Sequence, residues 1–228
     1  LEQCLREDLE GCAHRRMAVM KPLKLIIDNY PEGQSEELVA ENHPQKPEMG
    51  SRSITFSREL WIEETDFAEV PPKGFRRLTV PADGSPAKPV RLRYGYVIVP
   101  TSFEKDAEGR VTAVHANYLP ETKSGTEGSM SVKTKATIHW LDAQTARAAE
   151  FRVYDRLFNE PNPEAGEGTF LDHLTPNSKT ILQGYVEPCT ADAANEERFQ
   201  FERTGYFVAD RKDHAPEHPV FNLSVGLR

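Results

Sequence analysis

Hydrophobic positions at the start of the chain follow a helical period. Leu1, Cys4, Leu5, Leu9 and Cys12 recur at spacings of three and four, which is typical of one amphipathic helix. The pattern predicts that this helix ends near residue 14. Beyond it the helical period is lost, and short runs of alternating apolar and polar residues take over.

These alternating runs predict a mainly β protein. VRLRYGYVIV, residues 90–99, reads as one long strand with Arg91 and Arg93 on the same face. Residues 103–119 read as a hairpin that turns at Glu108-Gly109. Seventeen prolines and fourteen glycines separate the runs, a pattern that indicates a β-barrel or sandwich. Further strands are expected over residues 24–30, 52–62, 133–141 and 148–158, and in the two runs FQFERTGYFVADR and PVFNLSVGLR.

One loop is more closely specified than the others. NHPQKPEMGSR, residues 42–52, combines two prolines, a glycine, a histidine and three charged residues and follows neither period. Pro44 and Pro47 each remove a backbone donor and bias the preceding residue toward extended conformations. The loop is either a surface connection between strands or a recognition segment, and its composition does not decide between them.

The charge distribution adds a candidate binding surface. The formal net charge is −8, which argues against a protein that coats nucleic acid nonspecifically. Between residues 71 and 93, however, six basic residues face a single acidic one, Asp83. Arginine suits phosphate oxygens and base edges, and Phe75 offers a stacking surface for an unpaired base. The alternative is that these arginines pair with acidic neighbours on an exposed strand.

Several other functions find no support in the sequence. It contains no phosphate-binding or dinucleotide-binding glycine motif and no G-x-S-x-G, and no nucleophile–base pair can be assigned. No apolar run reaches the length of about 18 residues that spans a membrane, and no leader is recognisable. Pro216 lies between His214 and His218 and argues against a metal site there. Three cysteines outside any C-x-x-C pair suggest reduced thiols, and the start at Leu1 suggests a piece of a longer protein.

A family resemblance covers nearly the whole chain. The stretches RMAVMKPLKLIIDNYPEG, NHPQKPEMGSR, VRLRYGYVI, IHWLDA, YDRLFNEPNP, LQGYVEP, FQFERTGYF and PVFNLSVGLR together resemble the C-terminal anticodon-binding region of glutaminyl-tRNA synthetases. The resemblance implies two antiparallel six-stranded β-barrels, one inserted in the other. Residues 1–13 would end a helical connector, residues 14–65 and 155–228 would form the proximal barrel, and residues 66–154 would form the distal barrel.

The resemblance also implies residues that read the anticodon. Arg15 and Gln183 match residues that share a pocket for the middle base, a uracil, and Arg77 matches the arginine for the third base, a guanine. Arg91 and Arg93 match a pair at the first base and its phosphate. Unpaired bases are well suited to such reading through their Watson–Crick edges.

Two further candidates depart from the family pattern. Arg76 stands where lysine is usual, which keeps a phosphate contact but changes its geometry. Gln45 stands where asparagine is expected and has a longer reach, while Gly74 replaces a glutamine and removes that side chain.

The intact protein would then be a cytoplasmic, monomeric ligase. This chain would bind glutamine tRNA and carry no catalytic or metal-binding residue, while ATP with Mg and glutamine would bind a catalytic domain upstream, where a helical domain would also lie. No membrane is expected as a partner. The alternatives are the barrels of an archaeal or eukaryotic-type glutamyl-tRNA synthetase and, from another class, a β-barrel that docks a protein or glycan.

Overall fold

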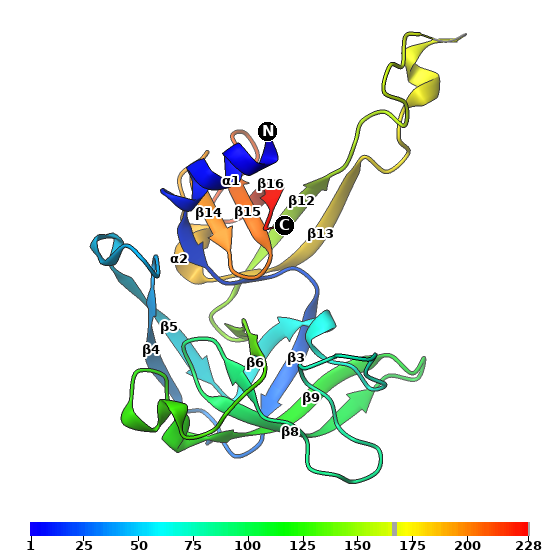
Figure 1. The fold of residues 1–228 in the computed structure, drawn as a ribbon. Helices are drawn as coiled ribbons and strands as arrows, with labels where there is room; N and C mark the ends of the chain where they lie inside the picture. Colours follow the sequence, from blue (N-terminus) through cyan, green and yellow to red (C-terminus); the bar gives the residue numbers. More distant parts are fainter. Residues whose placement is uncertain (166–167, 228) are drawn as a thin grey trace.

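Two seven-stranded sheets contain most of the strands in the computed structural model, which describes residues 1–165 and 168–227 (Figure 1). The first sheet joins both ends of the chain. In spatial order its strands are β1 (His14–Arg16), β14 (Arg198–Phe201), β15 (Gly205–Ala209), β16 (Val220–Gly226), β12 (Arg147–Tyr154), β13 (Lys179–Val186) and β2 (Ala18–Val19).

The second sheet is built from the middle of the chain. In spatial order its strands are β10 (Thr137–Ile138), β7 (Val90–Leu92), β8 (Val97–Lys105), β9 (Val111–Leu119), β3 (Pro22–Ile27), β6 (Glu59–Glu63) and β11 (Leu141–Asp142). The remaining strands, β4 (Ser35–Glu41) and β5 (Ser51–Ser57), form a separate hairpin.

Each sheet closes on itself through a short stretch of chain. The two edge strands of the first sheet, β1 and β2, are separated only by Met17. The edge strands of the second sheet, β10 and β11, are separated only by His139 and Trp140. Because the opposite edges of each sheet are joined by one or two residues, each sheet must curl round into a barrel. We call them the first and the second barrel.

The predicted mainly β class with two barrels, one inserted in the other, is confirmed, but two details differ. Each sheet has seven strands instead of six, and parallel pairs such as β3 with β9 occur among the antiparallel ones. The second barrel lies between β2 and β12 in the chain, so residues 22–63 belong to it, whereas the predicted proximal barrel included residues 14–65. Residues 147–154, predicted as distal, belong to the first barrel.

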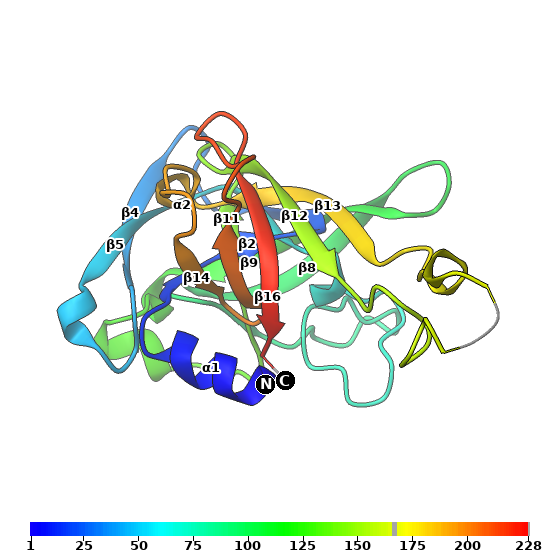
Figure 2. The ribbon, with the colours of Figure 1, turned by 90° about the horizontal axis from the view of Figure 1, so that it is seen from above.

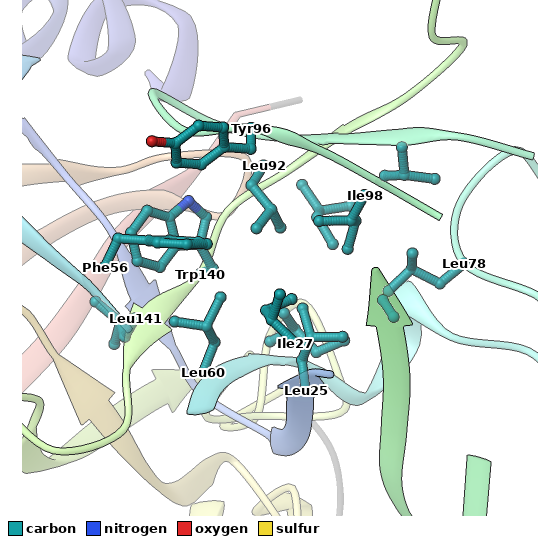
Figure 3. Close-up of a cluster of buried hydrophobic side chains, with 14 of the residues drawn as sticks. Leu25, Ile27, Phe56, Leu60, Leu78, Leu92, Tyr96, Ile98, Trp140 and Leu141 are labelled. Atoms are coloured by element: carbon teal, nitrogen blue, oxygen red, sulfur yellow. The ribbon is translucent and has the colours of Figure 1, made fainter. Parts of the chain in front are cut away.

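The barrels have separate hydrophobic cores. In β3 the alternation places Leu23, Leu25 and Ile27 inside the second barrel, where they meet Leu60, Ile98 and Trp140 (Figure 3). The first barrel encloses a cluster of phenylalanines with small alanines between them. Trp61 of the second barrel stacks on Tyr185 of the first, with ring centroids 5.1 Å apart.

Helices are few and short. Helix α1 (Glu2–Glu10) confirms the predicted amphipathic helix and packs on the first barrel through Leu9 and Tyr206. Arg6 Nε donates to the Gly226 carbonyl at 2.7 Å, so α1 lies beside the end of β16 (Figure 2). The others are α2 (Pro188–Ala191) and five 3₁₀ turns: η1 (Pro47–Met49), η2 (Glu64–Asp66), η3 (Pro120–Thr122), η4 (Glu127–Met130) and η5 (Phe170–His173).

Strands β12 and β13 continue beyond the first barrel as a projecting arm (Figure 1). The arm contains the predicted excursion of residues 159–176, of which residues 166 and 167 lie outside the described part of the chain. Phe158 and Phe170 pack edge to face near its end. Several of its apolar side chains are exposed: Tyr154, Leu157, Phe170, Leu171 and Ile181.

Candidate nucleic-acid interface

Arg15 is buried at the start of the first barrel. It is only 4% exposed, and its Nη2 donates to Glu10 Oε1 of α1 at 2.5 Å. Tyr206 donates its hydroxyl to the other oxygen of the same carboxylate. Burial alone would raise the pKa of Glu10, but these two partners outweigh it and lower the pKa. Arg15 Nη1 is also buried and has no hydrogen-bond partner within residues 1–165 and 168–227, so it can reach an RNA acceptor only if the atoms that cover it move aside.

The loop NHPQKPEMGSR connects β4 to β5 and contacts the end of α1. The backbone N–H of Gln45 donates to His43 Nδ1 at 3.1 Å, so His43 carries its proton on Nε2 and donates to the Glu10 carbonyl at 2.9 Å. Lys46 Nζ donates to the Gly11 carbonyl. The loop thus satisfies helix carbonyls that would otherwise lack donors. The side chain of Gln45 is exposed, and its predicted contact with RNA stays a prediction.

Arg76 and Arg77 follow Phe75 in an exposed loop of the second barrel. Arg76 is exposed. Arg77 is held on three sides while its side chain stays 40% exposed: Nη1 donates to the Thr65 carbonyl at 2.8 Å and lies 3.4 Å from Asp66 Oδ1, and its guanidinium lies over the Phe75 ring. An arginine that is both fixed and accessible is suited to reading a base edge.

The prediction that Arg91 and Arg93 share one strand face is wrong. The run of residues 90–99 is two strands, β7 and β8, joined by a turn in which Tyr94 adopts a left-handed conformation with φ of 61°. Arg91 turns toward its own barrel and donates to the Thr122 carbonyl at 3.1 Å and to the Ser129 carbonyl. Arg93 pairs with Glu202 of the first barrel, so a phosphate would have to compete with that carboxylate.

Gln183 lies on β13 with its side chain exposed. The pairing of Tyr185 with Val19 sets β13 against β2, which places Gln183 level with Lys21. Arg15 lies six positions earlier, and the described residues show no hydrogen bond between Arg15 and Gln183. Their shared pocket therefore stays a prediction.

A groove between the barrels was not predicted. Lys21, Arg77 and Arg203 line it together with Glu63, His139 and Leu182. Leu182 directly precedes Gln183, so the groove brings Arg77 of the second barrel near the β13 segment of the first. Arg203 lies in the stretch FQFERTGYF, where one arginine beside one glutamate shows no charge excess. Only the folding of the two barrels against each other reveals the cluster.

Other sites are not evident in the described ranges. Residues 1–165 and 168–227 contain no group of three or more His, Cys, Asp or Glu side chains placed to hold a metal ion. In the same ranges, no helix has both the length and the apolar character needed to cross a membrane.

Comparisons with known proteins assign the chain to a family of tRNA-binding domains. Residues 13–119 match the family model described as tRNA synthetases class I (E and Q), anti-codon binding domain, and residues 137–210 match a second model with the same description. The whole chain is similar to proteins named glutamine–tRNA ligase from Cupriavidus necator (60% identical), Polynucleobacter asymbioticus (51%) and Nitrosomonas europaea (49%). It spans 38%, 39% and 40% of their lengths, respectively. The chain therefore belongs to the anticodon-binding domains of the class I tRNA synthetases of the E and Q type.

Proposed function

We propose that this chain is the part of a glutamine–tRNA ligase that reads the anticodon of glutamine tRNA. The groove between the barrels is the observation that carries the proposal, because it sets Lys21, Arg77 and Arg203 against two carboxylates, Glu63 and the buried Asp66, and so keeps a small positive excess on a chain whose net charge is −8. A local basic groove on an acidic protein favours one defined RNA segment over bulk polyanion. The names of the relatives support glutamine over glutamate as the amino acid.

Within the proposal, two arginines read bases and others hold the backbone. Arg77 takes the third base because it is fixed beside Phe75 and remains accessible. Arg15 takes the middle base through its unpartnered Nη1 once the atoms that bury it move aside, with Gln183 as a second contact. Arg76 is exposed and suited to a phosphate. Arg91 and Arg93 have weaker support, since both are already paired within the protein. The support for Gln45 is the family resemblance alone.

The chemistry of aminoacylation lies outside this chain in the proposal. ATP with Mg and glutamine bind the remainder of the intact protein, which we propose to be a cytoplasmic monomer. The exposed apolar side chains of the β12–β13 arm support contact with that remainder, because apolar side chains gathered on one projecting element often mark an interface.

Binding of tRNA to the intact protein tests the proposal. We expect affinity for glutamine tRNA to fall steeply with salt, since phosphate contacts release counterions. Replacement of Arg77 by alanine should reduce discrimination at the third anticodon base by roughly 1–3 kcal/mol, as for base-edge contacts in general. Arg110→Ala is a matched control, because Arg110 is exposed and its side chain bonds, within residues 1–165 and 168–227, only to acidic neighbours in its own turn.

Two results would contradict the proposal. Affinity that does not change with salt would favour a protein-docking barrel. Equal aminoacylation of glutamine tRNA and anticodon-substituted tRNA by the wild-type protein would show that the protein does not read the anticodon bases.

A further inference from the structure

Asp66 is a fully buried carboxylate shared by the two barrels. It lies at the end of η2 in the second barrel with an exposed fraction of 0%. Arg203 of the first barrel grips it with two hydrogen bonds, Nη1 to Oδ2 at 2.8 Å and Nη2 to Oδ1 at 2.6 Å. Arg77 Nη1 approaches the same Oδ1 at 3.4 Å. A buried carboxylate requires such partners because burial removes its hydration.

Arg203 has an unusual backbone conformation. It sits in the turn between β14 and β15 with φ of 66°, a left-handed conformation that non-glycine residues rarely adopt. Such a conformation persists where the surrounding contacts fix it, and here they include His139 Nδ1 at 3.2 Å from Arg203 Nη1. Because arginine only donates, His139 Nδ1 accepts, which fixes the tautomer of this buried ring. The contact is therefore built from both barrels.

We infer that Asp66 is a positioning residue that makes base reading by Arg77 depend on the contact between the barrels. Arg203 holds the carboxylate, and the carboxylate together with the Thr65 carbonyl holds the Arg77 guanidinium at the groove. If Arg203 withdraws, Asp66 loses two hydrogen bonds and draws its remaining cationic partner, Arg77, inward and away from an RNA base. The inference rests on the proposed function and adds to it a residue that does not touch RNA.

A second ion pair between the barrels supplies a matched control. Arg52 of the β4–β5 hairpin bonds Glu187 of the first barrel through both Nε and Nη2, and the two side chains are 6% and 3% exposed. Glu187 also accepts from the Met17 amide. In the described part of the chain, none of the proposed base-reading side chains hydrogen-bonds to this pair. It thus resembles the Asp66–Arg203 pair in charge and in the burial of its carboxylate, but not in its connection to Arg77.

The experiment compares Asp66→Asn with Glu187→Gln in the intact protein. The readout is kcat/KM for glutamine tRNA relative to tRNA with the third anticodon base replaced. We expect Asp66→Asn to reduce this ratio roughly threefold to thirtyfold, which lies within the range of energetic coupling through one shared contact. Glu187→Gln should lower the melting temperature and leave the ratio unchanged. Discrimination at the middle base should be unaffected by Asp66→Asn.

A double variant separates positioning from a general loss of structure. If Asp66 acts through Arg77, adding Asp66→Asn to Arg77→Ala should produce no further loss of third-base discrimination. Arg203→Lys keeps the charge but not the two-pronged grip, so it should give an intermediate ratio even if Asp66→Asn fails to fold.

The outcomes distinguish a failure of the inference about Asp66 from a failure of the proposed function. An unchanged ratio in Asp66→Asn or in Arg203→Lys, with a reduced ratio in Arg77→Ala, overturns the inference and leaves the proposed function standing. An unchanged ratio in Arg77→Ala removes the proposed role of Arg77 and the inference with it. An equal loss in Glu187→Gln and Asp66→Asn also overturns the inference, since any weakening of the barrel contact would then suffice.

Discussion

The two barrels close by the same route but fill their interiors differently. In each, two very short edge strands lie within a few residues of each other in the chain. The first barrel packs phenylalanines against alanines: Phe151, Phe199, Phe201, Phe207 and Phe221 with Ala18, Ala149, Ala191 and Ala209. The second packs mainly leucine, isoleucine and valine, and its aromatic residues gather where the β4–β5 hairpin joins it.

This difference shows which features specify a barrel. Alternation of inward and outward side chains is common to both sheets, whereas the kind of apolar residue is not. The two interiors should therefore respond differently to the same type of change. Substitutions inside and on the surfaces of the two barrels test how far they differ, beginning with the largest expected effect.

Removal of a ring from the first core should have the largest effect. Phe201 is fully buried, and its ring centroid lies 4.9 Å from that of Phe207 and 5.3 Å from that of Phe221. We expect Phe201→Ala to reduce the free energy of unfolding by about 3–5 kcal/mol, because the cavity cannot collapse in a ring cluster. Urea unfolding followed by circular dichroism measures this, and Phe170→Ala on the exposed arm should cost much less.

Tryptophan fluorescence shows whether the second barrel responds. Both tryptophans, Trp61 and Trp140, belong to the second barrel. The ion pairs and the Trp61–Tyr185 stack join the barrels, so the fluorescence transition of Phe201→Ala should move to lower urea together with the circular dichroism. A fluorescence midpoint equal to that of the wild type would show that the barrels unfold independently.

A glycine where β13 meets β2 should tolerate an added side chain less well than a glycine in the turn between β7 and β8. A Cβ at Gly184 would lie 2.1 Å from the Val19 carbonyl oxygen, where β13 meets β2. We expect Gly184→Ala to cost about 1–3 kcal/mol, as for other overpacked sites. A Cβ at Gly95 in the second barrel meets its nearest atom at 3.5 Å, so Gly95→Ala should be tolerated. Equal melting temperatures for the two variants would contradict this account.

The smallest expected effect is the change with pH in the stability that ion pairs on the barrel surfaces contribute. Hydrogen bonding to Asp28 and Glu104 outweighs burial and raises the pKa of His115 on the second barrel above 6.5. Protonated His115 therefore stabilises the fold fully below pH 6.5, and the contribution disappears as pH rises through the raised folded-state pKa. His115→Gln should cost up to about 1 kcal/mol near pH 6, a typical value for a surface ion pair, and almost nothing near pH 9.

On the first barrel, the surroundings lower the pKa of an acidic group, Asp210, instead of raising that of a histidine. Burial works against the charge of Asp210, but hydrogen bonds from Asn222 and from backbone amides, together with Arg152, lower the pKa to about 2. This contribution is present above pH 3.8 and is lost only as pH falls toward 2. Melting temperatures of Asn222→Ala and wild type should therefore differ about equally at pH 6 and pH 9. A difference in melting temperature that disappears at high pH would show that the surface ion pairs of the two barrels respond to pH in the same direction.

Local features of the fold were predictable from the sequence, and distant pairings were not. Helix α1 and the hairpin of β8 and β9 follow from periodicity and from a turn at Glu108-Gly109, where Gly109 has φ of 81°. The assignment of β3 to the second barrel depends on its parallel pairing with β9, in which Lys24 lies opposite Ala113. No pattern within residues 22–27 specifies that partner.

The candidate site shows the same limit. Charge and family resemblance predict a role for Arg77, and the resemblance alone predicts one for Arg15; both roles stay predictions. Alternation placed Arg91 and Arg93 on one strand face because it could not foresee the left-handed turn at Tyr94. Asp66 and Arg203 are 137 positions apart, and neither stands out by charge. Their contact exists only because two folded barrels meet.

The insertion of one barrel into the other has a consequence for synthesis on the ribosome. Strands β1 and β2 emerge first but cannot join their sheet until β12 to β16 have been made. All seven strands of the second barrel emerge in between, so that barrel can complete its sheet while β1 and β2 wait. Translation thus imposes an order in which the inner unit matures before the outer one. Protease protection of stalled nascent chains should appear in residues 22–142 before it appears in residues 14–19.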